Sequence, residues 1–296
     1  MAWNFELVAG PFKGRTGGLA WDGKGMLVSA VAEERVLRFD PATGKADNFR
    51  RWTGRVNGVA IARDGSVFGA QEGGRRVVQF MTDGSTAPTE EMIEGAHHNQ
   101  PVDVILDKKG RVFFADAYNS QAPYGPPAYP FLPHASVLRL DNWGPRYWSL
   151  SRVTHDTVGP RAILLSADEK TLYVADGDSE RGDVCQLFAY PLNEHGSVGG
   201  HRKMLLNFAF PERGIEGMCL DSDGNIIACM GWNKGGGPPA IVVISPGGTI
   251  VETHPSPADA PMRVAFGDAD LGSLYLTAGD GGLYRAKGIG RRGLKR

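Results

Sequence analysis

Short runs of alternating apolar and polar residues, separated by turns, follow one another along almost the whole chain. Residues 214–231, GIEGMCLDSDGNIIACMG, show the unit: an apolar strand, a turn of the form D-x-D-G and a second apolar strand. Similar hairpins begin at residues 17, 57, 101, 160 and 262. Turn residues between short strands rich in β-branched and aromatic side chains are typical of antiparallel hairpins. The pattern therefore predicts an all-β protein.

The spacing of these hairpins predicts how the sheets are arranged. They recur at intervals of roughly 40–60 residues, the period of propeller blades. Most are followed by a third strand pattern, as in RVLRFDPATG, RVVQFMTDG, SVLRLDNWG and IVVISPGG. Blades in a ring also protect their own sheet edges. The alternative, a pair of β-sandwiches, is not expected to repeat one hairpin six times. We expect residues 1–296 to form a single domain, a six-bladed β-propeller with four-stranded blades, closed by the N-terminal strand WNFELVAG.

Composition narrows the class of partner. The 32 basic and 33 acidic side chains leave a net charge of −1, which gives no electrostatic reason to expect nucleic acid or an anionic membrane surface. No membrane-spanning run and no signal peptide is evident. Three sparse cysteines favour reduced thiols and a cytoplasmic location. The basic C-terminal run GIGRRGLKR is expected to be a solvated tail.

The start of the first strand in each blade is the expected functional region. These strands line the central channel of a propeller, so their first residues converge near its axis. One carboxylate, Glu216, is expected to face two arginines there, Arg161 and Arg263. The six convergent positions are Gly17, Asn57, Val102, Arg161, Glu216 and Arg263.

Several of these phrases resemble the regucalcin, gluconolactonase and luciferin-regenerating-enzyme family over essentially the whole chain. WDGKGMLVSAVAEERVLRFDPATG resembles its first blade and NQPVDVILDKKGRVFFADAY its third. SADEKTLYVAD and IEGMCLDSDGN resemble its fourth and fifth blades. The resemblance implies a six-bladed propeller that acts on small molecules, as the family's lactonases do, with a divalent cation, often calcium, in the channel.

The residues that would hold this cation differ from the family pattern. The family ligands are typically a Glu in E-G-P-x-W, an Asn in P-N-D, an Asn in P-N-G and an Asp in P-D-G. The matching phrases here are GGLAW, PVD, PRA and IEG, which place Gly17, Val102, Arg161 and Glu216 at the ligand positions. A hard cation needs six or more oxygen ligands, and this set offers one carboxylate. We therefore expect no metal and no other cofactor.

Positive side chains are expected to take the place of the cation. Two arginines, Arg161 and Arg263, against one carboxylate, Glu216, leave a surplus positive charge that suits a substrate carboxylate or a developing oxyanion. The alternative is a buried ionic cluster that plugs the channel, since burying such groups unpaired is costly.

A proline- and aromatic-rich insertion, residues 117–136, is expected to cover the pocket, with Trp232 as a second wall. Expected substrate contacts are Asn57, Asp103, Tyr118, Tyr124, Tyr129, His134 and Trp232.

The family resemblance, together with these residues, implies a lactonase-like hydrolase that acts on a small lactone or ester, anionic or carbonyl-containing. Glu216 would activate water or attack the carbonyl carbon, and Arg161 with Arg263 would stabilise the oxyanion. Two alternatives stay open: a metal-free lyase or isomerase with Glu216 as base, and a non-catalytic ligand-binding propeller. A free polar pocket favours an enzyme, whereas a filled channel favours the last. The sequence sets no oligomeric state.

Overall fold

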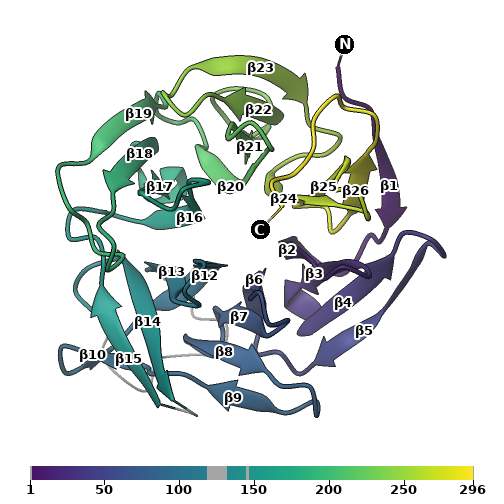
Figure 1. Cartoon of the computed structure of the whole chain (residues 1–296). Coiled ribbons are helices and arrows are strands. Elements are labelled where there is room, and N and C mark those ends of the chain that lie inside the picture. Colours follow the sequence, from purple (N-terminus) through teal and green to yellow (C-terminus); the bar gives the residue numbers. More distant parts are fainter. Residues whose placement is uncertain (1, 119–131, 145–146, 296) are drawn as a thin grey trace.

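Six four-stranded antiparallel sheets surround a central axis in the computed structural model, which describes residues 2–118, 132–144 and 147–295 (Figure 1). Each sheet is one blade, and in the first five blades the strands run outward from the axis in chain order. The six-bladed all-β propeller predicted from the repeated hairpins is confirmed. No helix among the described residues has the length and apolar character needed to cross a bilayer.

The strands of each blade follow from the hairpin pattern. Blades 1 and 2 contain β2 (Thr16–Trp21), β3 (Met26–Ala30), β4 (Arg35–Asp40), β5 (Lys45–Arg51), β6 (Val56–Ile61), β7 (Val67–Gln71), β8 (Arg76–Phe80) and β9 (Thr86–Pro88). Blades 3 and 4 contain β12 (Gln100–Leu106), β13 (Val112–Ala117), β14 (Ser136–Gly144), β15 (Tyr147–Arg152), β16 (Pro160–Leu165), β17 (Thr171–Asp176), β18 (Gln186–Pro191) and β19 (Lys203–Asn207). Blades 5 and 6 contain β20 (Ile215–Leu220), β21 (Ile226–Met230), β22 (Ala240–Ile244), β23 (Ile250–Pro255), β24 (Pro261–Gly267), β25 (Ser273–Ala278), β26 (Leu283–Ala286) and β1 (Phe5–Ala9).

Three short elements lie between the strands of the blade sheets in the described part of the chain. The hairpin β10 (Met92–Ile93) and β11 (Ala96–His97) precedes blade 3, and the 3₁₀ turns η1 (Val31–Glu33) and η2 (Ser179–Arg181) lie in blades 1 and 4.

The N-terminal strand closes the ring, as the sequence predicts. β1 pairs antiparallel with β26, with Phe5 opposite Ala286 and Glu6 opposite Arg285. Blade 6 is thus built from both ends of the chain, and Figure 1 shows the purple and yellow strands side by side.

In blade 1 the second strand from the axis is more buried than the outermost strand. Every residue of the second strand of blade 1, MLVSA, is buried, whereas every residue of its outermost strand, KADNFRR, is partly or fully exposed. Apolar side chains from neighbouring blades interlock, for example Phe113 and Val137 of blade 3 with Ile163 and Val174 of blade 4. Burying these apolar surfaces holds the blades around a common channel.

The expectation of a solvated C-terminal tail is wrong. Arg291 forms ion pairs with Asp221 and Glu252, and the amide of Leu294 donates to the carbonyl of Leu220 at 3.3 Å. The tail therefore packs across the innermost strands of the last blades, and Figure 1 shows its end near the axis.

A register irregularity occurs near the start of the innermost strand of every blade. In β12 it falls between Pro101 and Asp103, and in β20 between Ile215 and Gly217. The same shift occurs in β2, β6, β16 and β24. Bulges re-aim a side chain out of the sheet, and here the ring of blades repeats the device around one axis.

Candidate active site

The bulges bring one residue from each of five blades to the same end of the channel. They are Asn57, Val102, Arg161, Glu216 and Met262, and all line one cavity. Arg263 was expected at the matching position of blade 6, but the bulge of β24 gives that position to Met262. Arg263 instead matches Asp103 of β12, one step further along the strand.

This cavity, here called the upper cavity, has a volume of about 370 Å³. That size lies within the roughly 300–1,000 Å³ of small-molecule pockets. Charged and polar side chains dominate its lining: Arg15, Asn57, Glu72, Arg161, Asp178, Glu180, Arg181, Glu216 and Arg263. The channel end is therefore a polar pocket with free volume and is not filled by an ionic plug.

Glu216 is a buried carboxylate of this cavity, with a residue exposure of 6%. Arg161 Nη2 lies 3.2 Å from both of its carboxylate oxygens, and Arg213 Nε donates to Oε1 at 3.0 Å. Arg213 was missed by the sequence analysis, although it precedes Glu216 by three residues in RGIE. Glu216 thus faces two arginines, but the second is Arg213.

The pKa of Glu216 follows from this environment. Burial alone would raise the pKa, but the positive charges of Arg161, Arg213 and Arg263 outweigh burial and hold it far below its usual range. In turn the Glu216 carboxylate raises the pKa of Arg161. Both groups are therefore charged at neutral pH, a state in which Glu216 can accept a proton but has none to donate.

The expected surplus of positive charge at Glu216 is absent, because Arg161 is shared with a second acid. Its Nη1 donates to Asp178 Oδ2 at 3.1 Å. Arg161 and Arg213 are thus matched by Glu216 and Asp178. A guanidinium has five N–H groups, so the three hydrogen bonds that Arg161 makes to these carboxylates leave donors for a ligand.

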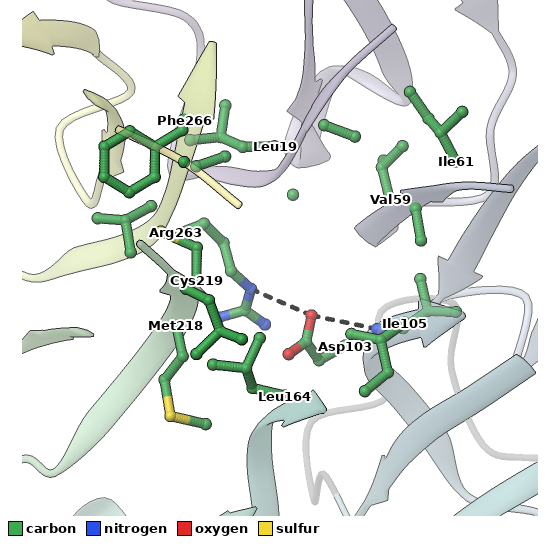
Figure 2. A pocket seen from close by; sticks show the side chains of 18 of the residues that line it. Leu19, Val59, Ile61, Asp103, Ile105, Leu164, Met218, Cys219, Arg263 and Phe266 are labelled. Atoms are coloured by element: carbon green, nitrogen blue, oxygen red, sulfur yellow. Dashed lines mark hydrogen bonds and ion pairs between the residues drawn. The ribbon is translucent and has the colours of Figure 1, made fainter. Parts of the chain in front are cut away.

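Arg263 lies at the floor of the upper cavity and joins several blades. Its Nη1 donates to the carbonyls of Glu216 and Met262, the latter at 3.0 Å. Its Nη2 donates to the carbonyl of Val102 at 2.9 Å. Figure 2 shows its Nε facing the carboxylate of Asp103, 3.6 Å away. Arg263 therefore contacts Glu216 through the main chain and not through the carboxylate.

A second acid, Glu72, lies in the upper cavity and was also missed. It is 3% exposed and forms ion pairs with Arg15 and Arg55. Asn57 Nδ2 donates to Glu72 Oε2 at 3.0 Å, while the buried Asn57 Oδ1 has no hydrogen-bond partner among the described residues. This oxygen is itself buried, so the contribution of Asn57 to the cavity is the hydrogen bond that holds Glu72 in place.

Of the other expected substrate contacts, some line the upper cavity and others lie outside it. Tyr118 lines the upper cavity, where the guanidinium of Arg181 lies 5.0 Å from its ring centroid. His134 lines a neighbouring hollow, with Nδ1 2.7 Å from Ser136 Oγ. Asp103 and Trp232 are not among the residues that line the upper cavity: Asp103 lies below it, and Trp232 packs against Arg213. Tyr124 and Tyr129 lie outside the described residues.

The family's divalent cation does not fit this donor set. A Cβ on Gly17 would lie 2.7 Å from the Asn57 carbonyl oxygen, so no longer side chain fits there unless the backbone moves. Val102 offers no donor, and both oxygens of Glu216 already face Arg161. Among residues 2–118, 132–144 and 147–295, no three His, Cys, Asp or Glu side chains are grouped to hold a metal. Calcium requires several oxygen ligands, and this position provides too few.

Comparison with known proteins identifies the family. The model described as SMP-30/Gluconolactonase/LRE-like region matches residues 15–280. A pentonolactonase of Haloferax volcanii is 27% identical over 252 residues, which cover 85% of this chain and 76% of that protein. A 6-deoxy-6-sulfogluconolactonase of Pseudomonas putida is 24% identical over 260 residues, covering 85% and 81%.

A solved gluconolactonase structure from Xanthomonas campestris has the same fold, with a TM-score of 0.81 at 23% identity over 96% of this chain and 89% of that one. The resemblance seen in the sequence is thus confirmed, and the chain belongs to the SMP-30/gluconolactonase/LRE-like family.

Proposed function

We propose that this protein hydrolyses a small lactone bearing an anionic substituent, in the upper cavity and without a divalent cation. The observation that carries the proposal is the open polar cavity around an ionised, buried carboxylate, Glu216. Relatives described as a pentonolactonase and a 6-deoxy-6-sulfogluconolactonase support the reaction class. The free volume of the cavity favours an enzyme over the non-catalytic alternative.

The proposed chemistry uses Glu216 as the base. A water oxygen bonds to the lactone carbonyl carbon while Glu216 takes one proton from that water. The carbonyl oxygen becomes negative and is stabilised by the N–H groups of Arg161 that are free of Glu216 and Asp178. The ring C–O bond then breaks, and the leaving oxygen recovers the proton from Glu216 to give a hydroxy acid. The strongly lowered pKa makes Glu216 a weak base, so Arg161 supplies much of the stabilisation.

An anionic substituent is proposed because one cation at the cavity lacks an acid. Among the described residues, no carboxylate lies within ion-pair distance of Arg181, an exposed residue of η2. The other arginines of the lining, Arg15, Arg161 and Arg263, each have an acidic partner. Arg181 can bind a carboxylate or sulfonate through two parallel N–H groups, with Tyr118 beside it.

The test compares lactones that differ only in charge. We expect wild-type protein to release acid from a lactone with a carboxylate or sulfonate substituent at lower KM than from the neutral lactone of the same ring. Arg181→Gln should raise the KM for the anionic lactone about tenfold, equivalent to about 1.4 kcal/mol, and leave the neutral one unchanged. Continuous titration of the acid released measures both.

The matched control is Arg202→Gln, which removes an arginine on the outer surface of blade 4, where it pairs with Asp156. It should change neither KM. Equal KM values for charged and neutral lactones would refute the anion site at Arg181, whereas no hydrolysis of any lactone would refute the proposed reaction.

A further inference from the structure

The upper cavity spans the channel from one side of the ring to the other. Its lining includes Arg15, which precedes β2 of blade 1, and Arg181 of η2 in blade 4. Blades 1 and 4 face each other across the axis (Figure 1). The volume of about 370 Å³ is more than twice that of an apolar cavity of about 150 Å³ that holds benzene. A ligand built on a small ring therefore fits between these two arginines.

Positive charge exceeds negative charge at the end of the cavity formed by blades 1 and 2. Arg15 Nη2 lies 2.5 Å from Glu72 Oε2, and Arg55 Nη2 lies 3.2 Å from Oε1 of the same carboxylate. In the part of the chain that the structure describes, no second carboxylate lies within ion-pair distance of either arginine. Two guanidinium groups thus share one carboxylate, which leaves one positive charge unmatched.

Arg15 is the arginine of this pair that can reach a ligand. It lines the cavity with a side chain that is 36% exposed, whereas Arg55 is not among the lining residues. Its hydrogen bond to Glu72 uses Nη2, so Nε and Nη1 keep their N–H donors, and neither of these two nitrogens is buried. Because the buried Glu72 already orients the guanidinium, little side-chain freedom remains to be lost when a ligand binds.

The opposite end of the cavity carries a second unmatched cation. Among the described residues, no carboxylate lies within ion-pair distance of Arg181, and the neighbouring Glu180 lies 4.0 Å from Lys234. Between the two ends, the arginines around Glu216 are matched by Glu216 itself and by Asp178. The cavity therefore has one unmatched positive charge at each end and matched charges between them.

A ligand with two negative charges matches this distribution, because arginine binds an anionic group through parallel N–H donors. We propose that the substrate of the lactone site carries two anionic groups, one on each side of its ring, and that Arg15 binds one of them while Arg181 binds the other. This inference rests on the proposed lactone hydrolysis and extends it, since that reaction requires only the anion at Arg181. Arg15 is then a substrate-binding residue that determines specificity.

Binding of inert ring acids tests the inference without turnover. The probes are cis-tetrahydrofuran-2,5-dicarboxylate, tetrahydrofuran-2-carboxylate and tetrahydrofuran-2-methanol, which share one ring and carry two, one or no negative charges. Isothermal titration calorimetry at low ionic strength, where exposed charges are least screened, measures their Kd values. We expect the diacid to bind about tenfold more tightly than the monoacid, the size of effect that one added hydrogen-bonded charge produces. The uncharged alcohol should bind more weakly than either acid.

Two variants assign the two charges. Arg15→Gln should remove the preference for the diacid and leave the Kd of the monoacid unchanged, because Arg181 still binds it. Arg181→Gln should weaken the binding of both acids. The matched control is Arg38→Gln: Arg38 lies in blade 1, has a similarly exposed side chain (39%) and pairs with Asp22 outside the cavity lining. Melting curves verify that each variant is folded.

A diacid that binds no more tightly than the monoacid, a preference that survives Arg15→Gln, or no binding of either acid would each overturn the inference. The lactone reaction is measured separately, by the acid released from lactones. Wild-type protein that prefers the diacid but hydrolyses no lactone would support the two-anion site and refute the reaction.

Discussion

Glu216→Gln is expected to lower kcat for lactone hydrolysis by about 10²–10⁴-fold, the usual contribution of a general base. The amide keeps the shape of the side chain but removes the negative charge that accepts the proton. It also leaves Arg161 with only Asp178 as an acidic partner. Steady-state kinetics on the anionic lactone measure the loss, and circular dichroism verifies that the propeller is retained.

Glu194→Gln is the matched control, because that glutamate lies at the surface with 82% of its side chain exposed. It should hydrolyse the substrate at the wild-type rate. Near-wild-type turnover by Glu216→Gln would show that Glu216 is only part of the ionic framework, and the base would then have to be sought elsewhere in the upper cavity.

Arg263→Met is expected to lower the free energy of unfolding by about 3–5 kcal/mol, the range for breaking a buried ion pair by removal of one partner. The change leaves Asp103 without its cation and removes hydrogen bonds to the carbonyls of Val102, Glu216 and Met262. These carbonyls belong to three different blades, so the loss falls on the contacts that hold the ring together. Denaturant unfolding measures the effect.

Two further variants sharpen this result. Adding Asp103→Leu to Arg263→Met should recover part of the stability, because it removes the stranded buried carboxylate. Arg285→Met, which removes an ion pair to the exposed Glu6, should cost about 1 kcal/mol or less. If Arg263→Met unfolds at the wild-type denaturant concentration, Arg263 does not stabilise the channel.

The fold could be predicted from the sequence because it depends on a repeated local pattern. Each hairpin carries its own turn and its own apolar strands, so the six copies specify six sheets without knowledge of long-range contacts. The closing strand was predictable too, since WNFELVAG is a strand pattern without a blade of its own.

The register of the site was predicted less well, and the reason is the bulge. In β12, β16 and β24 a proline precedes the bulged residue, which gives Val102, Arg161 and Met262. Aligning these prolines would have placed Met262 in the ring and Arg263 beside Asp103. A shift of one residue in a strand turns the side chain to another direction, so Arg263 lies at the floor of the upper cavity, where it faces Asp103, and not beside the carboxylate of Glu216.

The charged residues of the upper cavity that lie outside the innermost strands were harder to predict from the sequence. Glu72 follows the second strand of blade 2, and Asp178 follows the second strand of blade 4. Arg213 lies in the turn before β20. Their approach to the axis depends on loop geometry and blade packing, which a periodic pattern does not encode. For the same reason the tail was misjudged: its composition is basic, but the acids that bind Arg291 lie far away in the sequence.

The most direct test of the account is the lactone turnover of protein whose metal content has been measured by elemental analysis before and after treatment with a chelating resin. If Glu216 and Arg161 perform the reaction without a cation, the rate per mole of protein is the same before and after treatment. Adding calcium, magnesium, zinc or manganese then leaves it unchanged. A rate that falls with the metal removed and returns when one of these ions is added would contradict the account.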